Sequence, residues 1–248
     1  MSRNINYDLA FWKKRAEKYN NLEWANHRLY LREFVMAGHF TKHDIVLDVG
    51  TGTGIIAHIV SPLVKEVVGL DISQDMLNQS IWQGNEYFIK ADIRQSLFVE
   101  GMFDKITARQ VFHHILEDTQ KAMDECYRVL RKDGKMIFSE GVPPDDRSKE
   151  DYIEIFKLKE KRLTFMPQDL ENLMRNSGFK DIKTKIIWLE KISFKNWLIN
   201  SGLPIIIQKK IFMMRKKSPD YIKKAYRMIE TDEDCFIDMK IAILVGKK

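Results

Sequence analysis

The sequence predicts an α/β protein with a doubly wound sheet of seven strands, most of them parallel. The first observation is that short apolar runs, rich in β-branched residues, alternate along the chain with segments of helical spacing. The second is the segment 45–60, in which the run Ile-Val-Leu leads through glycines at 50, 52 and 54 into a potential helix. A buried strand, a glycine turn and a helix start are typical of a nucleotide-type ligand site at the edge of a parallel sheet.

Length and composition are those of one globular domain, residues 1–248. The chain is 44% hydrophobic and 31% charged, with a formal net charge of +6. No run of about 18 apolar residues is present, which predicts no transmembrane helix, and residues 1–6 lack the apolar core of a secretion signal. The two cysteines, Cys126 and Cys235, form neither a disulfide framework nor a metal-ligand spacing. We therefore expect a reducing, cytoplasmic setting and no bound metal.

The first 40 residues are expected to form a helical, aromatic-rich lead before the sheet begins. Residues 7–20 and 24–39 carry large aromatic side chains at roughly helical spacing, among them Tyr19. Aromatic stripes of this kind usually pack into a core. The alternative is that residues 1–40 form a lid over the ligand site.

The spacing of the glycines after the first strand distinguishes between ligands. A dinucleotide-binding loop reads G-x-G-x-x-G and would need glycine at position 55, where this chain has Ile55. The carboxylate of Asp48, two residues before Gly50, would repel a pyrophosphate and attract a cationic ligand. The loop therefore argues against a nicotinamide dinucleotide.

Two further strands are each followed by an acid. Residues 66–71 form the second predicted strand, whose last residue, Asp71, lies 21 residues after Gly50. A carboxylate about 20 residues beyond such a loop accepts hydrogen bonds from ribose hydroxyls, and a cap on the next helix is the alternative. Asp92 follows the third strand, 87–91, where it could serve as an N-cap.

The other predicted elements continue the alternation. The strands are 103–108, 135–140, 179–190 and 235–246, and the helices are 55–60, 74–82, 118–131 and 167–177. Gly134 and Gly178 are expected to cap the ends of the last two helices, and Pro167 begins the second of them. His113 and His114 follow the fourth strand.

The connection between the last two strands, residues 191–233, is longer than such a sheet needs. It is rich in large apolar side chains and in lysine and arginine, so we expect a helical cap over a substrate site. Its basic residues would favour an anionic substrate, although a basic run more often forms a solvated helix face. The side chains expected to line the pocket are Phe11, Trp12, Tyr19, Trp24, Trp197, Leu203, Ile207 and Phe212.

From about residue 44 to 179, these features resemble, in order and spacing, the class I S-adenosylmethionine-dependent methyltransferases, in particular the UbiE/COQ5-like type that acts on small molecules. Residues 48–54 are similar to the first motif of that family. Residues 128–135 resemble its R-V-L-K-P-G-G stretch, with Asp133 where glycine is usual, and residues 16–19 loosely match its A-x-x-Y element. The resemblance implies a last strand that is antiparallel and S-adenosyl-L-methionine as the cofactor.

The resemblance also implies roles for individual residues and segments. It assigns cofactor binding to Asp48, Gly50, Thr51, Gly52, Gly54, Asp71, Ile72, Met76, Asp92, Ile93, Arg109 and Gln110. Its catalytic candidates are His113, His114 and Tyr19; a histidine there either takes a proton from a hydroxyl nucleophile or holds a loop. The cofactor-binding core is expected at 44–190, between the lid (1–40) and the cap (191–233), with the last strand in 234–248.

The expected function is methyl transfer to a small molecule, at an oxygen, nitrogen or carbon that the sequence does not specify. One alternative is an RNA methyltransferase. A DNA or RNA amino-methyltransferase would carry an N/D-P-P-Y/F signature where residues 108–111 read Ala-Arg-Gln-Val, and the charge of +6 is moderate, so no DNA is expected. The other alternative is a non-catalytic scaffold that binds the same cofactor. The oligomeric state is not predicted.

Overall fold

The computed structural model describes residues 6–248, so the first five residues of the expected lid lie outside the described part of the chain. The described residues form one sheet of eight strands: β1 (Ile45–Val49), β2 (Glu66–Asp71), β3 (Glu86–Lys90), β4 (Phe103–Arg109), β5 (Leu130–Gly141), β6 (Lys180–Ser193), β7 (Ile229–Glu230) and β8 (Cys235–Lys247). Their order is β3-β2-β1-β4-β5-β8-β6, and the short β7, which the sequence did not predict, pairs with β8. The first five strands in that order are parallel, and β8 is antiparallel to both β5 and β6. The predicted fold class is confirmed.

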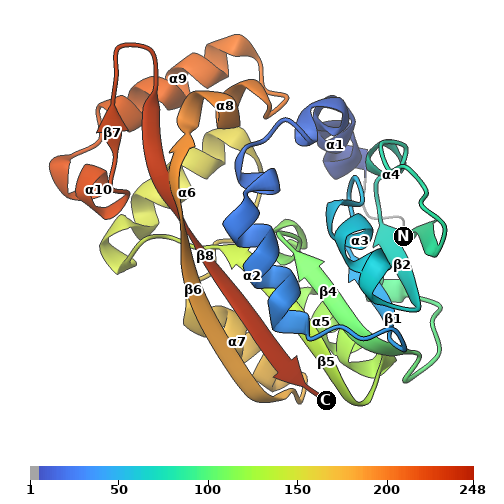
Figure 1. Ribbon diagram of the computed structural model, residues 1–248. Helices are drawn as coiled ribbons and strands as arrows, with labels where there is room; N and C mark the ends of the chain where they lie inside the picture. Colours follow the sequence, from blue (N-terminus) through green and yellow to red (C-terminus); the bar gives the residue numbers. More distant parts are fainter. Residues whose placement is uncertain (1–5) are drawn as a thin grey trace.

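Helices cover both faces of the sheet (Figure 1). They are α1 (Asn6–Tyr19), α2 (Arg28–Gly38), α3 (Ile55–Val60), α4 (Gln74–Leu77), α5 (Thr119–Val129), α6 (Lys149–Lys159), α7 (Pro167–Asn176), α8 (Phe194–Ile199), α9 (Ile205–Lys216) and α10 (Asp220–Ala225). Successive side chains of a strand point to opposite faces. Val46 of β1 therefore joins the core beneath α2 and α3, and Leu47 joins the core beneath α5 and α7. Within residues 6–248, no helix is long and apolar enough to span a bilayer.

One predicted helix ends before the glycine that was expected to cap it. α5 ends at Val129 and the chain enters β5 at once, so the prediction that Gly134 is its C-cap is wrong. Asp133 has the positive φ at this turn, 63°. Gly134 is required for another reason: a Cβ there would lie 2.9 Å from the backbone oxygens of Asp104 and Arg131.

Three helical segments differ from the predicted ranges. α4 ends at Leu77, although the prediction extended it to residue 82. The expected helix 24–39 is interrupted at His27, whose extended backbone separates a 3-10 turn, Trp24–Asn26, from α2. α6 occupies a stretch in which no helix was predicted.

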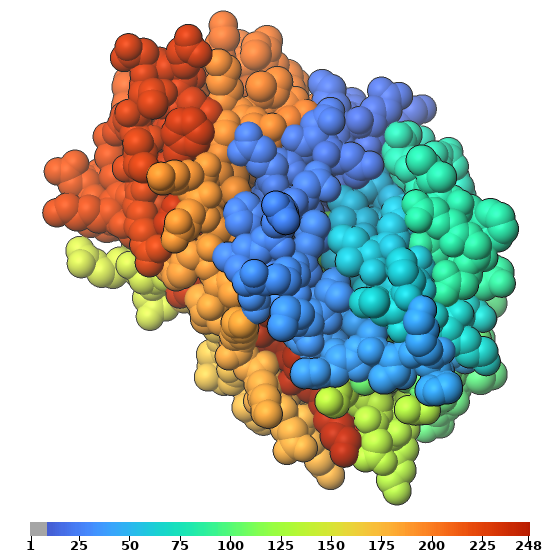
Figure 2. Space-filling view, in the orientation of Figure 1, coloured from blue at the N-terminus to red at the C-terminus, as the bar shows by residue number. Residues whose placement is uncertain are grey.

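The N-terminal segment lies between the C-terminal helices and the segment that contains α3, β2 and α4 (Figures 1 and 2). α1 packs against α4. The turn after α1 is bonded to the 191–233 segment: Asn196 Nδ2 donates to Asn21 O at 3.0 Å, and Ser193 N donates to Glu23 Oε2 at 3.0 Å. The turn after α1 and the beginning of the 191–233 segment are therefore held together by hydrogen bonds.

A buried hydroxyl network holds α2 to the sheet. The Tyr30 side chain is fully buried, and its hydroxyl lies 2.7 Å from Ser139 Oγ of β5. Gln110 Nε2 donates to the same hydroxyl at 3.1 Å, and Gln110 Oε1 accepts from Gly141 N at 3.1 Å. Burial raises the pKa of Tyr30 to about 12, so the hydroxyl stays protonated.

We expect Tyr30→Phe to lower the free energy of unfolding by about 1–3 kcal/mol, because Ser139 Oγ and Gln110 Nε2 both lose the Tyr30 hydroxyl as their partner. Tyr221→Phe is the matched control: this ring is 45% exposed, so its change should stay within about 0.5 kcal/mol. Urea denaturation measures both. Equal effects for the two variants would show that the network adds nothing.

Candidate functional site

A cavity of about 910 Å³ lies at the carboxyl ends of β1, β2, β3 and β4. This is where ligands bind in open parallel sheets. Among the described residues, eleven of the twelve predicted cofactor-binding residues line it: Asp48, Gly50, Thr51, Gly52, Asp71, Ile72, Met76, Asp92, Ile93, Arg109 and Gln110. Tyr19 and His114 line it as well, whereas Gly54 and His113 do not.

The glycine loop is shaped by three left-handed residues. Gly50, Gly52 and Gly54 have φ values of 64°, 58° and 82°, a region that side chains with a Cβ rarely adopt. At Gly50 a Cβ would also lie 2.3 Å from Val111 Cγ2. Gly54 precedes α3 as its N-cap, and its φ of 82° is what favours glycine there; a Cβ would in addition displace the His58 ring, whose Nε2 would lie 2.7 Å away.

The carboxylate of Asp48 is buried beneath this loop. Its Oδ1 accepts from Thr107 Oγ1 at 2.7 Å, and its Oδ2 has no hydrogen-bond partner within the described part of the chain. Burial raises the pKa of Asp48 to about 6, so the group is mostly ionised at neutral pH. An unpartnered buried carboxylate oxygen at a cavity wall suits a cationic ligand and disfavours a phosphate.

Asp71 ends β2 and organises the backbone around it. Its Oδ2 accepts from Gly52 N at 2.9 Å and its Oδ1 from Ser73 N at 2.8 Å. The N-cap of α4 is Ser73, whose hydroxyl accepts from Met76 N, so Asp71 does not cap that helix itself. Each carboxylate oxygen retains a lone pair that a ligand hydroxyl could use.

Asp92 has the capping role that was the alternative for it. Its Oδ1 accepts from Arg94 N at 2.9 Å and so caps the turn Ile93–Gln95, and its Oδ2 pairs with Arg94 Nη2 at 2.6 Å. The side chain nevertheless borders the cavity. A cap and a ligand contact are therefore compatible here.

Arg109 and Gln110 connect the end of β4 to the N-terminal segment. Arg109 Nη1 donates to Ala25 O at 2.9 Å, and its guanidinium lies over the rings of Trp24 and Tyr30. Gln110 has a positive φ of 60° and makes the Tyr30 bond described above. Both side chains thus position α2 as well as bordering the cavity.

Glu140, which the sequence analysis placed only in a strand, fixes the loop that carries the histidines. Its Oε1 accepts from the backbone N–H groups of Val111 at 3.1 Å and Phe112 at 2.8 Å, and its Oε2 pairs with His113 Nδ1. Burial raises the pKa of Glu140 to about 7 and lowers that of His113 well below its usual value. This places His113 in a structural pair behind the cavity wall.

His114 is the histidine that borders the cavity. Its ring lies edge-on to Trp12 at 4.7 Å and 4.0 Å from the ring of His113. Burial, followed by the charge of His113, lowers its pKa well below the usual value. His114 is therefore neutral at pH 7, a form that can accept a proton.

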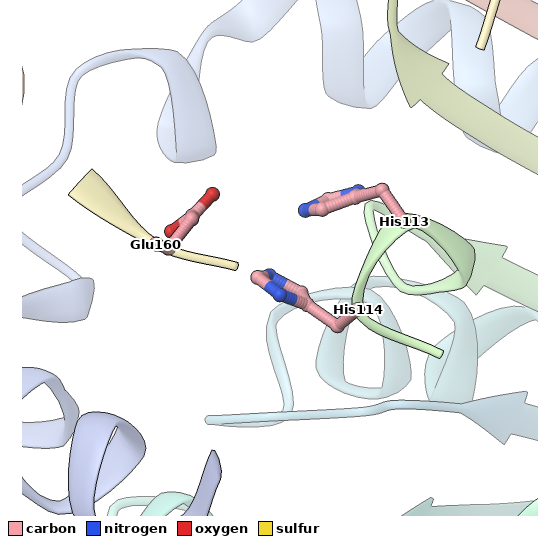
Figure 3. A group of neighbouring side chains, drawn as sticks. All are labelled: His113, His114 and Glu160. Carbon is pink, nitrogen blue, oxygen red and sulfur yellow. The ribbon is translucent and has the colours of Figure 1, made fainter. Parts of the chain in front are cut away.

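A second group of charged residues, absent from the sequence prediction, faces the histidines. Both imidazole rings point toward Glu160, which follows α6 (Figure 3). Nitrogen atoms of the two rings and a carboxylate oxygen of Glu160 lie within 4.8 Å of one another. Glu160 also pairs with Lys159, with Arg15 Nη1 at 3.3 Å and with Arg162 Nη1 at 3.5 Å.

Of the 191–233 segment, the described residues that reach the cavity are 202–204. Leu203 is thus the one side chain of the four expected there that lines it. Trp197 is buried, and Ile207 and Phe212 pack against the same core. The basic residues of this segment do not border the cavity. On the other side, Phe11, Trp12 and Tyr19 line it, whereas Trp24 does not.

Comparison with known proteins identifies a methyltransferase domain within the chain. Residues 47–138 match a family model described as a methyltransferase domain. The chain is 25% identical over 199 residues to a Bacillus subtilis protein named as the uncharacterized methyltransferase YcgJ, over 73% of this chain and 74% of that one. Residues 47–138 are therefore a methyltransferase domain, and the fold and the relatives are those of class I S-adenosylmethionine-dependent methyltransferases.

Two solved structures and one further relative are also similar to this chain. The crystal structure of YcgJ has the same fold, with a TM-score of 0.79 at 21% identity over 90% of this chain and 99% of that one. A demethylmenaquinone methyltransferase of Thermotoga maritima is 33% identical over 119 residues, 46% of this chain and 51% of its own length, so the chain spans about half of that relative. A Haemonchus contortus phosphoethanolamine N-methyltransferase 2, solved with S-adenosyl-L-methionine, shares the fold at a TM-score of 0.60 and 18% identity, over 92% and 56% of the chains.

Lys159 gives the methyltransferase a measurable dependence of stability on pH. Burial, followed by the charge of Arg15, lowers its pKa to about 7, although Glu160 acts in the opposite direction. Between pH 7 and 10 the unfolded chain therefore binds more protons than the folded chain, so the free energy of unfolding rises with pH. One proton contributes up to about 1.4 kcal/mol per pH unit.

We expect Lys159→Met to abolish this rise, so that the difference in unfolding free energy between wild type and variant changes steadily from pH 7 to 10. Denaturation at four pH values in that range measures it. Lys157→Met, whose side chain is 61% exposed, is the control and should run parallel to wild type. Parallel curves for Lys159→Met would contradict the lowered pKa.

Proposed function

We propose that this chain binds S-adenosyl-L-methionine in the 910 Å³ cavity and transfers its methyl group to a small molecule held in the same cavity. The observation that carries the proposal is that eleven of the twelve residues implied by the family resemblance line this one cavity. Ligand pockets commonly measure roughly 300–1,000 Å³. The cavity is at the upper end of that range, which leaves room for an acceptor beside the cofactor.

The residues present suit this cofactor. The carboxylate of Asp71 would accept from the two ribose hydroxyls, while the unpartnered Oδ2 of Asp48 would face the cationic end of the molecule. Ile72, Met76 and Ile93 supply apolar surface for the adenine. When bound, the cofactor supplies an electrophilic methyl group on a positively charged sulfur.

The acceptor would occupy the part of the cavity bordered by α1, residues 157–161 and residues 202–204. We infer that α1 acts as the lid and the 191–233 segment as the edge of a cap. The chain's contribution is to orient the acceptor and exclude water, and orientation alone can lower a barrier by roughly 7–11 kcal/mol. His114 is placed to take a proton from an acceptor that arrives protonated, and Tyr19 borders the same space.

Two rival functions have less support. An RNA acceptor would need a basic, aromatic-lined surface, whereas the rings of this site, Phe11 and Trp12, line a cavity. A scaffold without activity would have the same cofactor residues, so only a measurement of turnover distinguishes it from an enzyme.

A reducing cytoplasm would suit the two buried free thiols, Cys126 and Cys235.

We expect Asp71→Ala to weaken the binding of S-adenosyl-L-methionine by about 1.5–3 kcal/mol, roughly 10- to 150-fold, because charge-assisted hydrogen bonds to the ribose are lost. Titration calorimetry measures the change. Asp232→Ala, which removes an exposed acid far along the chain, is the control and should leave the affinity unchanged. An unaltered affinity in Asp71→Ala would remove Asp71 from the cofactor site.

We expect S-adenosyl-L-methionine and its demethylated product to raise the melting temperature, and NAD to leave it unchanged. At a concentration 100 times the Kd, a ligand adds about 2.7 kcal/mol to stability. Methyl-labelled cofactor should then label a metabolite extract. Label in total RNA alone would favour the RNA acceptor, and binding without any transfer would favour the scaffold.

A further inference from the structure

A buried cluster of cations lies at the acceptor side of the cavity. Arg15 from α1, Lys159 from the end of α6 and Arg162 just beyond it converge on the carboxylate of Glu160. Their side chains are only 1–6% exposed. The segment is fixed in place, since Leu163 N donates to His113 O at 2.8 Å. The cluster is therefore buried and held in a fixed position, unlike charged residues on the protein surface.

The cluster has more positive charge and more hydrogen-bond donors than its own acceptor uses. Within the described part of the chain, two guanidinium groups and Lys159, whose pKa of about 7 leaves it about half protonated at neutral pH, share one carboxylate. The nearby Glu140 is committed to His113 and to backbone N–H groups. Arg15 Nε and Arg162 Nη2 are buried with no acceptor among residues 6–248. Buried donors normally have partners, and buried cations normally have counter-charges.

The cluster also opens onto the space that the cofactor residues do not occupy. Lys159, Glu160 and His114 line the cavity, whereas Arg15 and Arg162 lie behind them. The rings of Phe11 and Trp12 line it as well, and the Arg15 guanidinium lies 5.5 Å from the centre of each ring. An apolar wall next to unmatched cationic donors fits a molecule with an apolar body and an anionic end.

We propose that the acceptor is an anion with an apolar body, whose carboxylate or phosphate oxygens dock on Lys159 beside His114, with the positive charges of Arg15 and Arg162 directly behind it. The inference rests on the proposed function for this cavity. The sequence had suggested that the basic residues of the 191–233 segment recognise the charge of the substrate, but these do not border the cavity. The proposed recognition site is instead at the end of α6.

A metal ion is the competing occupant, because His113, His114 and Glu160 have the ligand types and the proximity for one. The surrounding charges oppose it. Glu160 is already paired with three cations, and a divalent ion would be placed next to all of them. The ring of His113 is also held by Glu140. These contacts favour an anion.

The test uses the full chain and three probes with the same aromatic body: benzoate, phenyl phosphate and the uncharged benzyl alcohol. Calorimetry at constant ionic strength should give at least tenfold tighter binding for one or both anions than for the alcohol. If benzoate binds more tightly, the site prefers a carboxylate; if phenyl phosphate does, the site prefers a phosphate. Lys159→Met and Arg162→Met should each weaken the anion at least tenfold and leave the alcohol unchanged, and Lys159→Arg should retain most of the affinity. Lys209→Met, an exposed lysine of α9, is the matched control and should have no effect.

The variant Glu160→Gln distinguishes an anion from a metal ion as the occupant of this site. Removing the internal carboxylate should tighten benzoate binding several-fold if the site binds anions, whereas it should abolish a Zn²⁺ site. Equal binding of benzoate and benzyl alcohol, unchanged anion affinity in both methionine variants, or a stoichiometric Zn²⁺ site lost in Glu160→Gln would overturn the proposal. S-adenosylhomocysteine is titrated into every variant: its binding shows an intact fold, and its failure in wild type would count against the proposed function alone.

Discussion

The cavity depends on the left-handed backbone of the loop after β1. Gly50 can take its φ of 64° and leave room for Val111 only because it has no Cβ. Val111 is held in turn by Glu140, which accepts from its backbone N–H at 3.1 Å. A carboxylate on β5 thus fixes the loop after β4, and that loop packs against the glycine of the loop after β1. The floor of the cavity is one connected arrangement across three strands.

The sequence was sufficient to predict where a residue lies when its position depends on its immediate neighbours. The glycine spacing and the acids at the ends of β2 and β3 are local patterns, and a parallel sheet brings its strand ends to one edge, so Asp48, Asp71 and Asp92 meet as expected. The wrong C-cap at Gly134 has a related cause. A local rule identified the glycine, but the close approach of the Asp104 backbone, from a neighbouring strand, is what requires it.

The rest of the site could not be predicted because it consists of contacts between distant segments. Arg15 and Glu160 are 145 residues apart in the chain, and nothing near either one indicates the other. Glu140 reads as an ordinary strand residue until the pairing of β4 with β5 places it under the histidine loop. The basic run of the 191–233 segment was the more visible signal, but its residues lie outside the cavity lining.

One hydrogen bond at the end of α1 has a consequence for how two ligands would affect each other. Thr53, inside the glycine loop, donates to Asn20 Oδ1 at 2.6 Å, so the loop and the end of α1 are mechanically joined. A molecule that presses α1 toward α4 therefore also acts on the loop. Thermodynamic linkage is reciprocal: if bound acceptor changes the affinity for the cofactor by some factor, bound cofactor changes the affinity for the acceptor by the same factor. The Thr53–Asn20 hydrogen bond thus gives any ligand-induced shift of α1 a direct mechanical connection to the loop that carries the cofactor-binding glycines.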